Sequence, residues 1–149
     1  MKKHLLLCVE IEETAARIYR QLSNSKHLRG ELKVVLQNLA DDEDDHASQL
    51  RFALRFATGP AFTEKSFDLA PIKALLDRAK ALLDKTQQLD FDTRQAIDTG
   101  IELEQDFCQV HIDNSLEFKD QSLKRMFAAL AQDDRVHSQK LQDAKDRFL

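Results

Sequence analysis

The sequence predicts an all-α protein: a four-helix bundle made of two repeated helix hairpins, joined by a long crossover that contains a short helix. Three features predict this fold: few helix breakers, apolar residues at helical spacing, and an internal repeat. The 149 residues include only three Gly and two Pro, and so few breakers favour long helices over strands and tight turns. This length is typical of a single domain, here residues 1–149, and is sufficient to bury a core.

Breakers and capping residues divide the chain into its predicted helices. Long helices are expected at about 4–22, 31–57, 92–116 and 120–148, and residues 58–70 form the least regular segment. Pro71 suits the first position of a shorter helix that ends near Leu89. One long link between two up-down helix pairs is the ferritin-like connectivity.

Charge, apolar runs and cysteines exclude several classes of protein. The net charge of −4 does not indicate a nucleic-acid partner. The apolar run from Leu5 to Val9 is too short for a signal peptide, and no stretch is long enough to span a membrane. Cys8 and Cys108 form neither a disulfide framework nor a metal-type spacing. A cytoplasmic protein without membrane or nucleic-acid partners is expected.

An internal repeat relates the first two long helices to the last two. VEIEETAARIY (9–19) aligns with IELEQDFCQVH (101–111), and LADDEDDHASQL (39–50) aligns with LAQDDRVHSQKL (130–141). Three polar pairs match in this alignment: Glu12 with Glu104, Glu43 with Asp134, and His46 with His137. Repeated apolar positions are common in bundles, whereas repeated polar positions are not.

An acid interrupts the apolar stripe of each long helix near its middle. A buried carboxylate costs several kcal/mol without compensation, so either these acids face water or cations lie among them. In two of the helices, a histidine follows the acid by three residues and shares its face. These residues are Glu12, Glu43 with His46, Glu104, and Asp134 with His137.

Two Glu/Asp-x-x-His pairs in repeat register favour cations. Oxygen and imidazole nitrogen at positions i and i+3 can reach the same ion. Four carboxylates and two histidines nearly neutralise two divalent ions and leave coordination positions open for oxygen species. A single such pair is weak evidence, but two pairs with matching glutamates on the other helices predict a metal site.

These motifs resemble the rubrerythrin branch of the ferritin-like superfamily over essentially the whole chain. They are Glu12-x-x-Ala15-x-x-x-Tyr19, Glu43-x-x-His46, Glu104, and Asp134-x-x-His137. The resemblance implies two non-haem iron ions inside the bundle, although manganese or zinc suits the same ligands.

By position, the resemblance implies that Glu12 with His46 holds one iron and Glu104 with His137 the other. Glu43 and Asp134 would be the bridging carboxylates, and Tyr19, the predicted catalytic residue, would hydrogen-bond a ligand carboxylate. The family chemistry is oxidation of a ferrous pair by hydrogen peroxide or dioxygen, followed by re-reduction.

Three departures from the family pattern change these expectations. Asp134 stands where the family has a glutamate, and its shorter arm predicts weaker occupancy or altered geometry in that half of the site. Phe107 occupies the position of an additional glutamate, which argues against peroxidase behaviour that relies on a switching ligand. Two cysteines are too few for a rubredoxin-like four-cysteine module, so electrons are expected to come from a separate donor protein.

Three residues of the third long helix have open roles. His111 lies two turns after Glu104 and is a hydrogen-bond donor to a ligand, an extra ligand, or a core histidine with a polar partner; the last is favoured. Cys108 is interpreted as a small buried hydrophobe rather than an oxidant sensor. Gly100 is expected to open room beside the site.

The acidic run DDEDDH (41–46) contains four further acids that fall mostly off the apolar stripe. They are interpreted as solvated surface, with a weak cation-entry path as the alternative. These acids are Asp41, Asp42, Asp44 and Asp45.

The sequence thus predicts a non-haem di-iron oxidoreductase that reacts with hydrogen peroxide or dioxygen, in oxidative-stress defence. One rival is iron oxidation for storage or detoxification, which requires a large cage. The other is a metal-free helical interaction module with a decayed site, of which Asp134 is the first sign. Besides the electron donor, a second copy of the chain is expected as a partner, in a homodimer.

Overall fold

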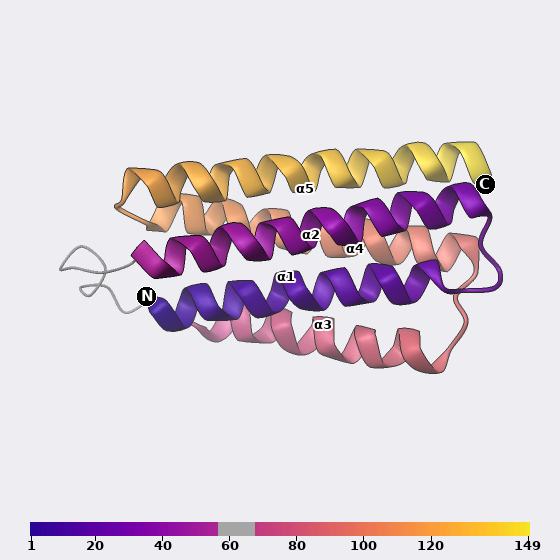
Figure 1. Ribbon diagram of the computed structural model, residues 1–149, viewed down its shortest axis with the longest axis horizontal. Coiled ribbons are helices and arrows are strands. Elements are labelled where there is room, and N and C mark those ends of the chain that lie inside the picture. The colour runs from indigo at the N-terminus through magenta and orange to yellow at the C-terminus, as the bar shows by residue number, and fades with distance from the viewer. Residues whose placement is uncertain (57–67) are drawn as a thin grey trace.

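The computed structural model describes residues 1–56 and 68–149, which form five α-helices and no strand (Figure 1). The predicted all-α class is therefore confirmed. The helices are α1 (Lys2–Ser23), α2 (Gly30–Phe56), α3 (Ala70–Gln88), α4 (Thr93–Glu117) and α5 (Gln121–Phe148).

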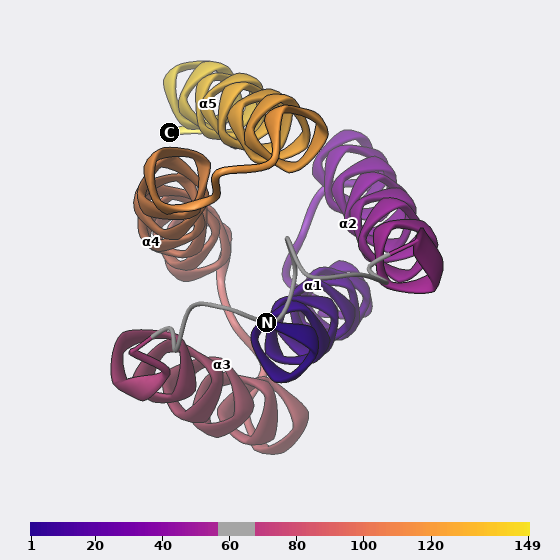
Figure 2. The same ribbon diagram turned by 90° about the vertical axis from the view of Figure 1, so that its left-hand side faces the viewer.

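The long helices form two antiparallel hairpins, α1 with α2 and α4 with α5 (Figure 1). An end-on view places these four helices around a common centre, with α3 outside them beside α1 (Figure 2). Because α2 ends at the opposite end of the bundle from the start of α4, the connection must run the length of the molecule. Helix α3 provides that run, as the predicted crossover requires.

Helix starts follow the capping signals in the sequence. Asp92 accepts a hydrogen bond from the Gln95 backbone, and the Gln95 side chain accepts one in return, which is a capping box at the start of α4. Asp120 caps α5 in the same way through the backbone of Leu123. Pro71 stands in the first turn of α3, where its missing N–H is tolerated. The predicted boundaries differ from these by one or two residues.

The predicted end of the second helix, Ala57, and most of the irregular segment 58–70 lie outside the described residues. Within the described part of the chain, no helix is long and apolar enough to cross a membrane.

Gly100 does not open space beside the site, contrary to our expectation. A Cβ at this position would lie 2.8 Å from Cδ1 of Leu141 and 3.3 Å from Cε1 of Tyr19. The missing side chain therefore allows α4 to pack closely against α5 and against the Tyr19 ring of α1.

Candidate metal centre

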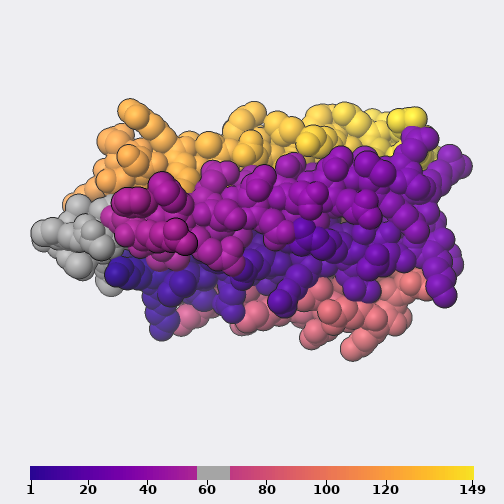
Figure 3. All heavy atoms as spheres, in the orientation of Figure 1, coloured from indigo at the N-terminus to yellow at the C-terminus, as the bar shows by residue number. Residues whose placement is uncertain are grey.

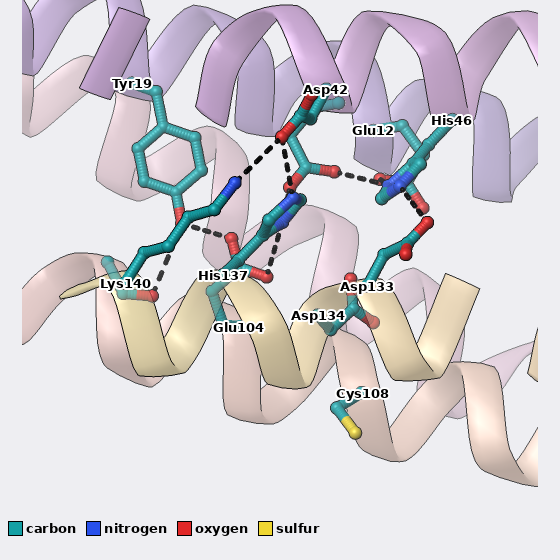
Figure 4. Close-up of polar contacts among 12 residues, drawn as sticks. Glu12, Tyr19, Asp42, His46, Glu104, Cys108, Asp133, Asp134, His137 and Lys140 are labelled. Carbon is teal, nitrogen blue, oxygen red and sulfur yellow. Dashed lines mark hydrogen bonds and ion pairs between the residues drawn. The ribbon is translucent and has the colours of Figure 1, made fainter. Parts of the chain in front are cut away.

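All six predicted metal ligands are buried, and their side chains converge between the four long helices. Figure 4 labels all of them except Glu43. Each of the four surrounding helices supplies one carboxylate, because the acid in each helix lies on its inward apolar stripe. The side chains are Glu12 on α1, Glu43 and His46 on α2, Glu104 on α4, and Asp134 and His137 on α5, and none is more than 3% exposed.

The ligand atoms form two overlapping groups, within each of which all atoms lie within 4.8 Å of one another. The first group is Glu12, Glu43 and His46, and the second is Glu43, Glu104, Asp134 and His137. Glu43 belongs to both groups, which suits a bridging carboxylate. Asp134 belongs only to the second.

Several atoms of these side chains have no aligned hydrogen bond within the described residues. Five carboxylate oxygens and one ring nitrogen are in this state: both oxygens of Glu12, Oε1 of Glu43, Oε2 of Glu104, Oδ1 of Asp134, and Nδ1 of His137. Leaving one buried polar atom unsatisfied costs about 1–3 kcal/mol. Carboxylate oxygens that converge without aligned hydrogen bonds are what a cation site requires, so the residues present fit a metal centre.

The ring of His137 illustrates this arrangement. Its Nδ1 lies 3.1 Å from Oε1 of Glu43 and 3.4 Å from Oε2 of Glu104, although neither contact is an aligned hydrogen bond. On α2, Nδ1 of His46 lies 3.0 Å from Oε2 of Glu43 and 3.7 Å from Oε2 of Glu12. Both histidines therefore direct Nδ1 toward the carboxylates.

The outer ring nitrogens form reciprocal contacts between α2 and α5. Nε2 of His46 lies 3.2 Å from Oδ2 of Asp133, and Nε2 of His137 lies 3.1 Å from Oδ2 of Asp42 (Figure 4). The two rings stack with centroids 5.6 Å apart. A carboxylate that accepts the second N–H of a histidine fixes the tautomer and strengthens it as a metal ligand.

From the sequence we expected Asp42 to be a solvated surface residue, and this expectation is wrong, because its carboxylate contacts His137. Its partner Asp133 was missed, although the two aspartates align in the repeat and each precedes a predicted ligand. In contrast, Asp41 and Asp44 form exposed ion pairs with Arg20, as solvated surface residues do.

A cavity of about 200 Å³ opens beside the two histidines, between α2 and α5. These helices adjoin on the face that Figure 3 presents. Acidic side chains predominate among the charged groups of the lining, which consists of Asp42, Asp45, His46, Gln49, Asp133, Val136, His137 and Lys140. The cavity is therefore suited to admit cations and small polar molecules.

Tyr19 forms the hydrogen bond expected of it. Its hydroxyl donates to Oε1 of Glu104 at 2.5 Å and lies 3.4 Å from the carbonyl oxygen of Gly100. Burial and the charge of Glu104 raise the pKa of Tyr19 well above its usual value, which keeps the hydroxyl protonated as a donor. Its assignment as a catalytic residue remains a prediction.

His111 lies inside the candidate centre, although from the sequence we expected a core histidine with a polar partner. Its Nδ1 lies 2.6 Å from Oδ2 of Asp134, and its Nε2 lies 2.8 Å from Oε1 of Glu12. The ring thus has polar partners, but both are predicted ligands. A histidine on the same stripe as Glu104 was the only signal in the sequence.

Cys108 is half-buried, and its thiol donates to the carbonyl oxygen of Ala131 at 3.5 Å. Burial raises the pKa of this thiol, which disfavours the reactive thiolate. In Figure 4 it lies apart from the dashed contacts. These features favour the interpretation of Cys108 as a packing residue.

The carboxylates of the two groups differ in their protonation. Burial alone would raise the pKa of Glu12, but the charge of His111 and the nearby ring nitrogens of His111 and His46 lower it to about 2. Burial and the charge of Glu43 raise the pKa of Glu104 to about 8, and burial raises that of Asp134 to about 6.

The histidines hold protons strongly when no cation is bound. Burial disfavours their charged form, yet the surrounding carboxylates raise the pKa of His46 to about 12 and those of His111 and His137 to about 10. Since metal ligands must be deprotonated, metal binding here would release protons.

A comparison with known protein families identifies the chain. The rubrerythrin family model matches residues 3–145, which is nearly the whole sequence. The chain belongs to the rubrerythrin family. No curated protein and no solved structure matches it. This rubrerythrin has Phe107, buried in the core, one turn after Glu104, where the family pattern implies an additional glutamate.

Proposed function

We propose that this rubrerythrin is a non-haem di-iron oxidoreductase that reduces hydrogen peroxide or dioxygen. The observation that carries the proposal is the convergence of five unsatisfied carboxylate oxygens from all four surrounding helices. Glu12 and His46 would hold one iron, Glu104 and His137 the other, and Glu43 would bridge them. Asp134 would be a ligand of the second iron rather than a second bridge, because it belongs to the second group alone.

A bound ferrous pair would supply the two electrons that, together with two protons, convert hydrogen peroxide into two waters. The chain contributes ligand orientation and access. Asp42 and Asp133 hold the Nε2–H groups of the two histidines, so Nδ1 of each remains free for metal. The cavity between α2 and α5 gives small molecules a path to these rings.

The two electrons must be returned after each turnover. These electrons must come from a donor outside the metal centre, and Phe107 offers no carboxylate for a ligand switch at its position. We propose a separate redox protein as this donor, a homodimer as the assembly, and the cytoplasm as the location.

The test is anaerobic loading with Fe(II), followed by one equivalent of peroxide or dioxygen. The expected results are about two ions per chain and a rise of near-ultraviolet ferric absorbance with the oxidant. Asp44→Asn is the matched control, because Asp44 lies at the surface, where it pairs with Arg20. Fewer than about one ion per chain would instead support a metal-free helical module.

Iron oxidation for storage is a second candidate, favoured by the acidic lining of the cavity beside the histidines. Storage needs a large cage, whereas the oxidoreductase needs only a small assembly. Light scattering of the native protein separates them: a dimer supports the oxidoreductase, and a cage of many copies supports storage.

A further inference from the structure

The two candidate ion positions do not have equal sets of ligands. Three residues converge at the first position and four at the second, and only Glu43 is shared. In the repeat, Asp134 corresponds to Glu43 and would be the second shared carboxylate. It stays with the second group, and its Oδ2 lies 2.6 Å from Nδ1 of His111. The first position therefore lacks the fourth ligand that a symmetric centre would give it.

The ring of His111 extends from Asp134 to the residue that would need this ligand. Its Nε2 lies 2.8 Å from Oε1 of Glu12, and the ring is only 2% exposed. This contact is not an aligned hydrogen bond, since Oε1 of Glu12 has none within the described residues. Two ligand atoms that lie side by side around one ion have this relationship.

Donation from Nδ1 to Asp134 leaves the lone pair of a neutral His111 on Nε2. That lone pair and the Glu12 carboxylate are both acceptors, and two acceptors at this distance repel each other unless a cation or a proton lies with them. A histidine that donates one N–H to a carboxylate and binds a metal through its other nitrogen is a recurrent arrangement in metal sites.

We propose that His111 is a metal ligand, through Nε2, of the ion held by Glu12, Glu43 and His46. The proposal rests on the metal centre proposed above. Asp134 then has two roles: ligand of the second ion and acceptor that orients His111. Because His111 belongs to neither group of converging atoms, its ring or the Glu12 side chain must close toward the ion on binding.

The consequence is a centre with two chemically different positions. The first has two histidines and two carboxylates, and the second has one histidine and three carboxylates. Imidazole suits iron and zinc, whereas carboxylate oxygen suits manganese. The first position should therefore select iron or zinc over manganese more strongly than the second.

Tyr19 provides the competing interpretation. It aligns with His111 in the repeat, and it donates a hydrogen bond to Glu104 as His111 would to Glu12. A phenol that stays protonated cannot bind a metal, but an imidazole can. This position of the repeat can therefore hold either a hydrogen-bond donor or a metal ligand. The number of imidazoles bound to metal separates them.

The first measurement needs no variant. X-ray absorption of the wild-type protein, loaded anaerobically with Fe(II), counts the imidazole rings bound per pair of ions. Three rings are expected, from His46, His137 and His111. A count of two would overturn the proposal while leaving the metal centre in place. A protein that binds no iron would overturn the centre itself and this ligand with it.

The second measurement uses His111→Asn. Asparagine keeps an N–H donor for Asp134 in place of Nδ1 but provides no counterpart of Nε2. Equilibrium dialysis with Fe(II) should show one ion retained and the affinity for the other reduced by at least about 10–100-fold. The matched control is His4→Asn, which removes a buried histidine two turns before Glu12 and should retain both ions. Wild-type affinity for both ions in His111→Asn would contradict the proposal.

Discussion

The two helix hairpins of this rubrerythrin place similar residues in the centre, but the two halves differ in chemistry. The contacts of His46 with Asp133 and of His137 with Asp42 are nearly equivalent. Glu43, however, belongs to both ligand groups, whereas its counterpart Asp134 belongs to one.

The two helices that each supply one of the six predicted ligands, α1 and α4, differ as well. Tyr19 of α1 donates to Glu104 of α4, whereas His111, at the equivalent position of α4, contacts Glu12 of α1 and Asp134. One methylene fewer in Asp134 thus coincides with an imidazole beside it. The difference suggests that changes at neighbouring positions compensate for each other, and it makes the two halves separately testable.

The largest effect is expected from Glu43→Gln, because Glu43 is the residue that the two groups share. Replacing its carboxylate should lower the affinity for both ions by more than about 100-fold, which is beyond the loss typical of groups that only orient a ligand. Metal analysis after anaerobic dialysis against Fe(II) measures this, with Asp44→Asn as the neighbouring surface control. Retention of one ion at wild-type affinity would show that Glu43 serves only one position.

The next effect concerns the aspartates that hold the outer histidine nitrogens. Asp133→Asn should lower the affinity for the ion at His46 by about 10–100-fold, and Asp42→Asn should lower the affinity for the ion at His137 to the same extent. Each variant thus affects the ligand on the opposite helix. Calorimetric titration with Fe(II) under anaerobic conditions resolves the two binding steps.

Asp45→Asn is the control for these variants, because Asp45 lines the same cavity, whereas Asp42 and Asp133 are the aspartates that hydrogen-bond the two rings. If it lowered affinity equally, the general acidity of the cavity, rather than the hydrogen bonds to the histidines, would be responsible.

The six ligands could be predicted from the sequence because each interrupts an apolar stripe, so its inward direction follows from helical periodicity. The contacts of Asp42, Asp133 and His111 could not, since they depend on how one helix is rotated against another. Asp42 lies at the edge of its stripe, in a run where every neighbour is acidic. The sequence does show that Asp42 and Asp133 are identical residues at equivalent positions of the repeat, but only the structure shows that each contacts a histidine.

Lengthening the side chain of Asp134 tests whether Asp134 and His111 compete for the same space. In Asp134→Glu, the extra methylene enters a filled site and should destabilise the apoprotein by about 1–3 kcal/mol. Combining it with His111→Ala should recover part of this loss, because the ring then leaves room. Urea unfolding of the two single variants and the double variant measures their coupling. Strict additivity would show that the two side chains do not compete.

The smallest effect is the pH dependence of apoprotein stability, in which Glu12 and Glu104, one acid from each half, should act in opposite directions. In the first, the pKa of Glu12 is lowered to about 2, so its contribution to stability is present above its ordinary value of 4.5 and is lost only in strong acid. In the second, the pKa of Glu104 is raised to about 8, so its contribution is present below pH 4.5 and is lost as pH rises through 8.

The histidines act in the same direction as Glu104. The pKa values of His111 and His137 are raised from 6.5 to about 10, so their contribution is lost as pH rises through 10. The melting temperature of the apoprotein should therefore fall between pH 6.5 and 10. Glu104→Gln should flatten the part of this fall that lies below pH 8, whereas the exposed Glu102→Gln should leave it unchanged. Loading with Fe(II) should abolish the fall, because metal replaces the protons that hold the carboxylates together. A melting temperature that rises over this range in the apoprotein would mean that the histidines are neutral in the folded state and do not offset the buried acids.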